Sequence, residues 1–421
     1  MSLSKTIQKT SILNKKTTLK VFLYTISACL IVFICLIQLS RNSYILITEN
    51  FVKEAFDDVA DLKYIDVYNK RDFLSKDLKF ILMWRYCKNH DPFIQLGEGQ
   101  RAFIKNNCSA VNCYVTYDKY FLGGDVTKFD AIAFNGVFIN ALSKYKFPKV
   151  RSPHQKYIYF NLESADNYPV CSSVFDGFFN WTATYKLNSD ILFAYVQIRN
   201  RSGAIVGPKK NMEWVKNMSL QNDSFIVHNK SKAVAWLVSN CNGRSGRDEI
   251  VRHLQNYLQR YKLTVDIYGY CGPYKCPREL MNSCLNMLGR KYYFYLSLEN
   301  SFAEDYVTEK LLSALNHNMI PIVYGGADYS RFLPPNTYLD ALQMRRQELG
   351  DTIAQLMTSP QQYNQYFWWK SHYTYEHPRT MDTVCAVCAA LNNKTMMEAK
   401  TVYDDFRIWW NPSYRIRCKS P

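Results

Sequence analysis

A lysine in the first turn of a predicted helix is the first residue that suggests chemistry. Residues Tyr292–Gly326 read YYFYLSLENSFAEDYVTEKLLSALNHNMIPIVYGG, which predicts a buried strand, a polar loop and an amphipathic helix. Thr308 is a suitable N-cap and Glu309 suits the first turn, but Lys310 places a positive charge against the helix dipole. Either its side chain extends into solvent, or it shares the helix N-terminus with a bound anion such as a diphosphate. Both interpretations remain open on charge alone.

The elements that must position this segment occur along the chain in two series. Apolar runs near residues 79, 114, 131 and 157 alternate with polar helical stretches. After a polar, sequon-rich stretch at 199–232 the alternation restarts with AVAWLVSN, TVDIYGY, YYFYLSLEN and MIPIVYGG. Two α/β units are expected, and their parallel sheets would bind a nucleotide-like ligand at the carboxyl ends of the strands. No G-x-G-x-x-G follows the first strand, which disfavours a dehydrogenase, but fold analogy alone does not identify the reaction.

The charge balance indicates an anionic partner. The formal net charge is +16, which is typical of proteins that bind nucleic acid, an anionic membrane surface or a phosphorylated small molecule. Five lysines precede residue 21, and the other cations are scattered without zinc-finger spacing or a basic helix interleaved with aromatics. The pattern argues against nucleic acid and leaves a phosphorylated ligand open.

An uncharged apolar run at residues 21–39 predicts one transmembrane helix. The lysines before it place residues 1–20 in the cytosol and the rest of the chain in the lumen, a type II topology. A cleaved signal peptide is the alternative, although its apolar region would be shorter and end in small residues. A luminal location fits eleven cysteines after the anchor, an odd number that leaves at least one free or paired between chains. It also fits seven Asn-x-Ser/Thr sequons, at Asn107, Asn180, Asn200, Asn217, Asn222, Asn229 and Asn393.

The segment that carries Lys310 resembles the donor-binding signature of the alpha-1,3-fucosyltransferase family. That signature is an aromatic strand, E-N-S, D-Y-x-T-E-K, a helix and P-x-V-x-G. The matching residues are Glu299, Asn300, Ser301, Asp305, Tyr306, Thr308, Glu309, Lys310, Pro321, Val323 and Gly325. The resemblance also includes ILMW at 81–84, FNWTATYKLNSDI from Phe179, VAWLVSNCNGRSGR from Val234, Cys108 with Cys113, and Cys385-x-x-Cys388. It covers nearly all of residues 78–390.

The resemblance implies a GT-B architecture, in which two Rossmann-like domains face a cleft. It also implies inverting transfer of fucose from GDP-fucose to the 3-hydroxyl of N-acetylglucosamine in an acceptor oligosaccharide on a glycoprotein or glycolipid. It assigns the grip on the nucleotide sugar to Asn300, Tyr306, Glu309 and Lys310. In the family an arginine after the V-S-N strand neutralises the diphosphate. We expect Arg247 rather than Arg244 in this role, because Arg247 opens an amphipathic helix where phosphate would also meet free backbone N–H groups.

An inverting transfer also requires a general base for the proton of the acceptor hydroxyl. Glu163 ends the strand YIYFNLES and matches the glutamate of the family's E-S-P motif, which implies that Glu163 is this base. Taken alone, it would read as an ordinary surface glutamate. Ala165 replaces the proline of that motif, which predicts a less rigid loop. No D-x-D occurs and the histidines do not cluster, so we expect no tightly bound cofactor and no need for a divalent metal.

We therefore expect a stem at 40–75, an acceptor domain at 76–230, a GDP-fucose-binding domain at 231–380 and a tail at 381–421 that packs back on the acceptor domain. We expect disulfides Cys108–Cys385 and Cys113–Cys388 rather than a zinc or redox site at the C-x-x-C. Phe302 stands where many invertebrate relatives have a cysteine, so the pairing of the other cysteines stays open: Cys87, Cys171, Cys241, Cys271, Cys276, Cys284 and Cys418. The aromatic run at 367–373 is more typical of a core than of a sugar platform, and its role is left unassigned.

Two other functions compete with this interpretation. One is an inactive glycan-binding protein that kept the fold, although a pure binder would need neither Glu163 nor the donor signature. The other is a transferase that uses a different nucleotide sugar. The sequence does not identify the acceptor glycan. The topology predicts an anchored protein of the secretory pathway with its catalytic part in the lumen, and the family resemblance implies that its membrane is that of the Golgi.

Overall fold

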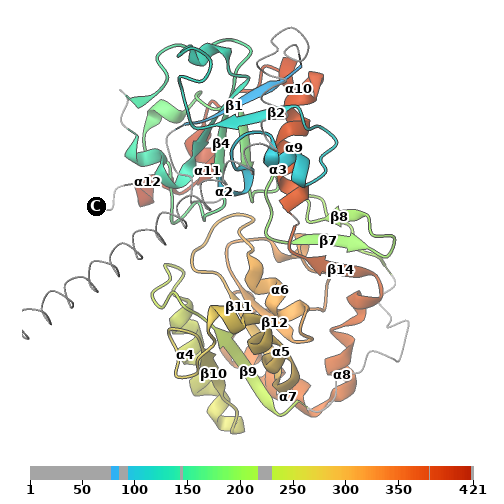
Figure 1. Cartoon of the computed structure of the whole chain (residues 1–421). Coiled ribbons are helices and arrows are strands. Elements are labelled where there is room, and N and C mark those ends of the chain that lie inside the picture. The colour runs from blue at the N-terminus through green and yellow to red at the C-terminus, as the bar shows by residue number, and fades with distance from the viewer. Residues whose placement is uncertain (1–76, 85–92, 143–145, 217–229, 379, 419–421) are drawn as a thin grey trace, which may run out of the picture. The chain divides into compact units, whose positions relative to one another are not determined.

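The computed structural model describes residues 77–84, 93–142, 146–216, 230–378 and 380–418. Within these residues the chain forms two parallel sheets, one from each series of apolar runs (Figure 1). The first sheet has the strand order β2-β1-β3-β4-β5-β6. Its strands are β1 (Lys79–Trp84), β2 (Cys113–Thr116), β3 (Ala131–Asn135), β4 (Lys156–Asn161), β5 (Trp181–Thr184) and β6 (Ile191–Leu192).

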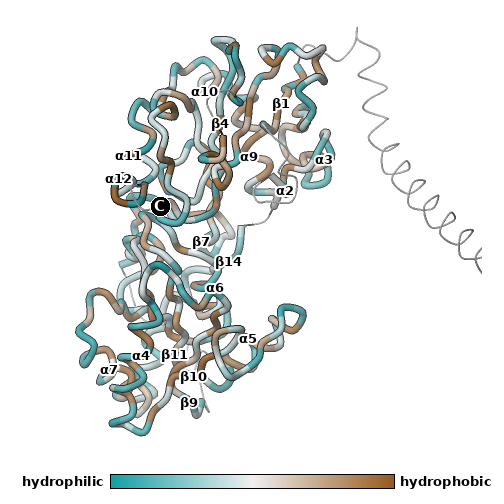
Figure 2. The backbone as a smooth tube through the Cα atoms, turned by 90° about the vertical axis from the view of Figure 1, so that its left-hand side faces the viewer, coloured by the Kyte–Doolittle hydropathy of each residue, from teal (hydrophilic) through white to brown (hydrophobic). Residues whose placement is uncertain are grey.

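The second parallel sheet has the strand order β10-β9-β11-β12-β13. Its strands are β9 (Lys232–Leu237), β10 (Val265–Tyr268), β11 (Tyr292–Leu298), β12 (Ile320–Tyr324) and β13 (Leu339–Asp340). All of β12 and all but one residue of β11 are buried. Strands that are covered on both faces read as continuous apolar runs, which is why they could be recognised in the sequence. Figure 2 shows apolar residues along β9, β10 and β11.

Helices cover both faces of the second sheet. Helices α4 (Arg247–Leu258) and α7 (Arg346–Thr358) pack on one face, and α8 (Pro360–Gln365) follows α7. Helices α5 (Met281–Lys291) and α6 (Glu309–Leu315) contribute to the core on the other face. Strands β9 and β11 are parallel neighbours, and the chain runs from their carboxyl ends into α4 and α6. The starts of α4 and α6 therefore lie at the same edge of the sheet.

A small antiparallel sheet was missed by the sequence interpretation, which treated 199–232 as a polar separator. Its strands are β7 (Gln197–Asn200), β8 (Ile205–Gly207) and β14 (Tyr373–Glu376), in the order β14-β7-β8. The central strand pairs with β14, a partner far along the chain that local periodicity does not reveal. Trp368 and Trp369 are buried in the cluster beside this sheet, so the aromatic run at 367–373, which the sequence left unassigned, contributes to the core.

The C-terminal part of the chain packs on both faces of the first sheet. Helix α9 (Thr380–Asn392) joins one core, together with α3 (Arg101–Lys105). Phe406 and Trp410, of α11 (Phe406–Trp410), join the core on the other face. The remaining helices are α2 (Phe93–Leu96), α10 (Lys394–Glu398) and α12 (Tyr414–Arg417).

Five disulfides close the described part of the chain. Cys108–Cys385 and Cys113–Cys388 confirm the two predicted bridges, so both cysteines of the C-x-x-C are in disulfides. The pairs that the sequence left open are Cys171–Cys418, Cys241–Cys271 and Cys276–Cys284. Cys87 lies outside the described residues, as do the expected tail, membrane segment and stem at 1–75. No helix among the described residues is long and apolar enough to cross a membrane.

Candidate active site

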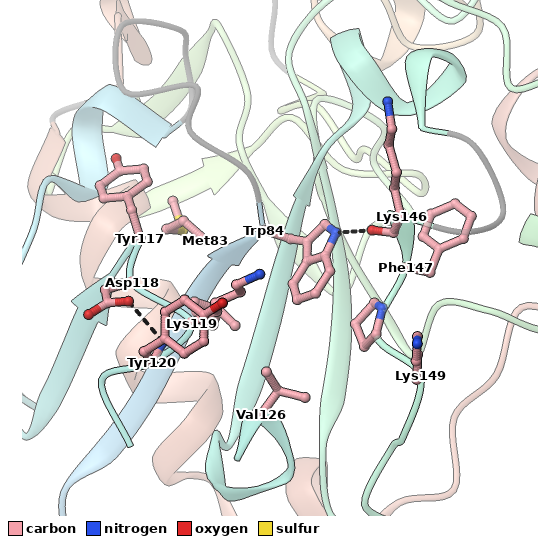
Figure 3. A pocket seen from close by; sticks show the side chains of 12 residues that line it. Met83, Trp84, Tyr117, Asp118, Lys119, Tyr120, Val126, Lys146, Phe147 and Lys149 are labelled. Carbon is pink, nitrogen blue, oxygen red and sulfur yellow. Dashed lines mark hydrogen bonds between the residues drawn. The ribbon is translucent and has the colours of Figure 1, made fainter. Parts of the chain in front are cut away.

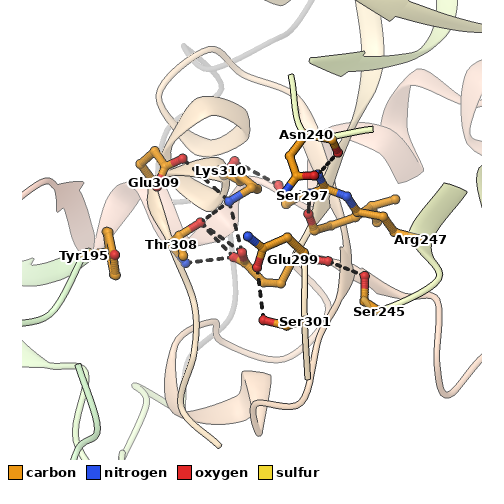
Figure 4. A network of polar contacts seen from close by, with 12 residues as sticks. Tyr195, Asn240, Ser245, Arg247, Ser297, Glu299, Ser301, Thr308, Glu309 and Lys310 are labelled. Carbon is orange, nitrogen blue, oxygen red and sulfur yellow. Dashed lines mark hydrogen bonds and ion pairs between the residues drawn. The ribbon is translucent and has the colours of Figure 1, made fainter. Parts of the chain in front are cut away.

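The corner between β11 and α6 is organised around a buried carboxylate. Glu299 directly follows β11 and is 1% exposed. Its Oε1 accepts hydrogen bonds from the backbone N–H and the hydroxyl of Thr308, at 2.8 and 3.0 Å, and its Oε2 accepts one from Lys310 at 3.1 Å (Figure 4). Helix α6 begins at Glu309 with Thr308 as the N-cap residue, as expected, but the Thr308 hydroxyl bonds Glu299 instead of capping the helix. Glu299 therefore fixes the loop and the helix start together.

The Lys310 ammonium is held in place as a cation. It donates to Thr308 Oγ1 at 2.7 Å and lies 3.6 Å from a carboxylate oxygen of Glu309. Burial alone would lower the pKa of Lys310, but the charges of Glu299 and Glu309 outweigh burial and the pKa is raised. The side chain is 21% exposed, so it neither extends freely into solvent nor is sealed in the core. Its charge is available at the surface of the adjoining cavity.

Arg247 is the first residue of α4 and is 2% exposed. Its two terminal nitrogens donate to the carbonyls of Leu298 and Asn240, at 2.8 and 2.7 Å. Its Nε is buried and has no hydrogen-bond partner among the described residues. Burial lowers the pKa of Arg247, although an arginine keeps its charge in proteins. The guanidinium thus links the ends of β9 and β11 and brings a fixed positive charge to this edge of the sheet.

A cavity of about 570 Å³ opens at this edge. Four of the six residues expected at the site line it: Arg247, Asn300, Glu309 and Lys310. The sequence interpretation assigned no role to other polar residues of its lining: Ser239 and Asn240 belong to the V-S-N motif, whereas no motif gave a signal for Arg278, Asn282, His317 and His377. A volume of this size and a lining of mixed apolar and polar groups suit a small-molecule ligand.

Tyr306 and Glu163 do not line that cavity. Tyr306 is 3% exposed and packs edge-on against Tyr185, with ring centroids 4.9 Å apart, so it belongs to a core shared by both halves. Glu163 follows β4 of the first sheet and is half-buried, and its backbone N–H donates to Asn161 Oδ1 at 2.8 Å. Burial raises the pKa of Glu163, Lys310 lowers it and Glu309 raises it. These last two effects place Glu163 within electrostatic reach of the lysine on α6.

Contacts between the two halves confirm that the segments around Glu163 and Lys310 adjoin. The Asn167 amide donates to Asn300 Oδ1 at 3.4 Å, and the Leu187 N–H donates to Asp305 at 3.1 Å. Lys186 forms an ion pair with Glu304 at 2.9 Å. The carboxyl ends of β4 and β5 in one sheet thus meet the loop after β11 in the other.

A second cavity, of about 690 Å³, lies at the ends of β1 and β2 (Figure 3). Its lining combines aromatic side chains with lysines and includes Trp84, Tyr120, Phe147, Lys119, Lys146 and Lys149. The Trp84 indole N–H donates to the Lys146 carbonyl at 3.0 Å. This cavity borders the sheet that carries Glu163, on the strands beyond β3.

Comparison with known proteins identifies the family. Residues 76–196 match the model of the fucosyltransferase N-terminal domain, and residues 227–409 match that of the glycosyltransferase family 10 (fucosyltransferase) C-terminal domain. The chain is 36% identical over 320 residues to alpha-(1,3)-fucosyltransferase C of Drosophila melanogaster, across 74% of this chain and 72% of that protein. The chain belongs to glycosyltransferase family 10. It is a fucosyltransferase.

Other relatives of this fucosyltransferase carry similar names. It is 36% identical over 237 residues to glycoprotein 3-alpha-L-fucosyltransferase A of Drosophila melanogaster, across 55% of this chain and 43% of that protein. A solved alpha1,3-fucosyltransferase structure is 16% identical, with a TM-score of 0.45, and the match covers 78% of this chain and 92% of that one. Within the described residues, the fucosyltransferase has no group of three or more His, Cys, Asp or Glu side chains that could hold a metal ion.

Proposed function

We propose that this fucosyltransferase is an inverting enzyme of GT-B architecture that moves L-fucose from GDP-fucose to the 3-hydroxyl of an N-acetylglucosamine in a glycoprotein or glycolipid glycan. The observation that carries the proposal is the meeting of a half-buried carboxylate, Glu163 on the first sheet, with a cation-lined cavity at the end of the second. An acid–base group on one side and a diphosphate site on the other are the two parts that this reaction needs.

The donor cavity offers fixed positive charge for a diphosphate. Lys310 presents its ammonium there, and Arg247 reaches it from the start of α4, a helix of twelve residues. A guanidinium and an ammonium form strong charge-assisted hydrogen bonds with phosphate oxygens. In this proposal Arg247 and Lys310 stabilise the GDP that leaves, while Asn300 and Glu309 bind the rest of the nucleotide sugar. Tyr306 supports the loop from the core rather than touching the donor.

Glu163 acts as the general base. The acceptor's 3-hydroxyl oxygen forms a bond to the anomeric carbon of fucose, the bond from that carbon to the diphosphate oxygen breaks, and the hydroxyl proton moves to the Glu163 carboxylate. GDP departs with the electron pair of the broken bond. Burial raises the pKa of Glu163, which makes its carboxylate a better proton acceptor, while the charge of Lys310 offsets part of this rise. No metal takes part, because the cations of the cavity carry the charge of the diphosphate.

The acceptor glycan enters along the first sheet. The aromatic and lysine-lined cavity at the ends of β1 and β2 supports this placement, because β1 is separated from β4, the strand before Glu163, only by β3. Neighbouring strands are about 4.8 Å apart, so the two strand ends are roughly 10 Å from each other. Further sugars of the acceptor would occupy this cavity. We also propose that residues 1–40 anchor the enzyme in the Golgi membrane as a type II protein.

A panel of donors and acceptors tests the proposal. Residues 60–421, secreted from cells, should transfer fucose from GDP-fucose and should not use other nucleotide sugars. Turnover of another donor would identify a different transferase. Binding of a glycan without turnover of any donor, by folded and monodisperse protein, would identify an inactive glycan-binding protein instead.

A further inference from the structure

The loop that carries Glu163 is held by residues from the far end of the chain. We call residues 163–168 the base loop and residues 406–418, which include α11 and α12, the C-terminal segment. The Asn411 amide donates to the Ala165 carbonyl at 2.9 Å, and the Trp410 indole donates to the Tyr168 carbonyl at 2.9 Å. Both donors are buried, Trp410 at 1% and Asn411 at 7% exposure. Two carbonyls of the base loop are therefore fixed from this segment.

An ion pair adds a third contact between the same two pieces of chain. Asp166 is 5% exposed, and both of its carboxylate oxygens accept from Arg417, through Nε and through Nη2, the latter at 3.0 Å. The bidentate geometry fixes orientation as well as distance. The disulfide Cys171–Cys418 then ties the next residue of the C-terminal segment to the chain just beyond the base loop. The base loop cannot shift without breaking several of these contacts.

The base loop also touches the donor half. Arg244 donates to the carbonyl of Asp166 at 3.3 Å, and the Asn167 amide donates to Asn300 Oδ1 at 3.4 Å. Asn300 lines the donor cavity. Asp166 is thus contacted by Arg417 through its carboxylate and by Arg244 through its backbone. The C-terminal segment holds the loop at the point where base and donor cavity meet.

We infer that the C-terminal segment positions the general base, with Arg417 and Asn411 as positioning residues that act through the base loop. The inference rests on the proposed function, because it takes Glu163 as the base. It also accounts for Ala165, which stands where the family's E-S-P motif has a proline. Rigidity that a proline would supply within the loop comes here from a segment that follows more than 240 residues later.

A merely stabilising role for Arg417 is separable from a positioning role by kinetics. Arg417→Ala should lower kcat by roughly 10- to 100-fold, since small displacements of a catalytic group have effects of this order. The Kd for GDP should stay within about 2-fold, because Arg417 does not contact the donor cavity. Arg415→Ala is the matched control: it removes an exposed arginine of the same helix, whose side chain hydrogen-bonds only Tyr414 within the part of the chain that the structure describes. It should leave kcat unchanged.

The decisive readout is a double-mutant cycle with Glu163→Gln. If Arg417 acts through Glu163, then Arg417→Ala should cause little further loss in the Glu163→Gln enzyme, and the two effects should not add. The transfer rate should fall at low pH as the Glu163 carboxylate is protonated, and we call this fall the acid limb. It should move to lower pH in Arg417→Ala, because a looser loop exposes Glu163 to water and so lowers its pKa. Among the described residues, the charged or titratable groups facing Glu163 are Lys310 and Glu309 on α6, Tyr195 and Tyr306, and none of these changes.

The outcomes separate the inference from the proposed function. Folded Arg417→Ala with wild-type kcat and acid limb, or with a loss that adds fully to that of Glu163→Gln, overturns the inference alone. Normal turnover by Glu163→Gln overturns the proposed mechanism. If Arg417→Ala does not fold, then Arg417→Lys, which keeps the charge but loses the bidentate contact, and Asn411→Ala take its place in the same cycle. Each should show the same non-additivity.

Discussion

Replacing Lys310 by alanine should weaken GDP binding strongly. Its ammonium lines the donor cavity and is held there by bonds of 3.1 Å to Glu299 and 2.7 Å to Thr308. Hydrogen bonds to charged groups contribute about 1.5–3 kcal/mol each. At about 1.4 kcal/mol per decade, losing one such contact with the diphosphate raises the Kd for GDP by roughly 10- to 150-fold. Use of GDP-fucose should fall with it, because donor and product share the diphosphate.

The same substitution should also lower the stability of the folded protein. Glu299 is 1% exposed, and among the described residues its carboxylate would keep only the hydrogen bonds from Thr308. Removing one partner of a fully buried ion pair costs on the order of 3–5 kcal/mol, but Lys310 is 21% exposed, so solvent screens this pair and the loss should be smaller. Thermal unfolding must therefore be measured beside binding.

Isothermal titration of GDP into the secreted protein is the assay. Lys394→Ala serves as the control, because Lys394 is 86% exposed and its 3.8 Å ion pair with Glu398 lies on the surface, where such pairs contribute little. It should change neither the Kd nor the melting temperature. If a folded Lys310→Ala protein binds GDP with wild-type affinity, then Lys310 does not contact the diphosphate and the phosphate site lies elsewhere.

Three further predictions concern stability, modification and metal. Replacing Cys113 and Cys388 by serine leaves the neighbouring Cys108–Cys385 bridge in place, so only a short loop is opened and the cost should be about 2–3 kcal/mol on the chain-entropy model, seen as a lower melting temperature; an unchanged melting temperature would contradict a stabilising role. Asn180 should carry no glycan, because its amide accepts from the Tyr157 N–H at 2.9 Å and donates to the Thr401 carbonyl at 2.8 Å, whereas Asn393 is exposed; peptide mass mapping that finds a glycan on Asn180 would contradict this. Transfer of fucose should persist in excess EDTA. A loss of activity that Mn²⁺ restores would show that the cations of the cavity are not sufficient to balance the charge of the diphosphate.

The parts of the fold that the sequence predicted are those with a local signal. Central strands such as β4 and β11 are buried on both faces and read as apolar runs. The start of α6 after Thr308 followed from capping preference, and the two predicted disulfides followed from family resemblance. The antiparallel sheet was missed because β7 and β14 pair across most of the C-terminal half.

The candidate site likewise combines residues that have a local sequence signal with contacts that have none. Motifs indicated four donor-binding residues, and the structure places all four around one cavity: Arg247, Asn300, Glu309 and Lys310. The motif could not show that Tyr306 lies in the core, because its burial depends on Tyr185 from the other half. It also gave no hint that Arg417 bonds Asp166, a contact between residues 251 positions apart. Such pairs have no local pattern, and only the folded chain brings them together.

The rate of fucose transfer by Glu163→Gln shows whether Glu163 is the general base. Glutamine keeps the size of the side chain but accepts no proton, and general base catalysis typically contributes about 10²- to 10⁴-fold, so kcat should fall by that order while GDP affinity hardly changes. The wild-type rate should fall as pH falls through the pKa of Glu163, which burial raises above its ordinary value, and any residual activity of the variant should lack this limb. Near-normal turnover by a folded Glu163→Gln enzyme, with the acid limb intact, would contradict the account.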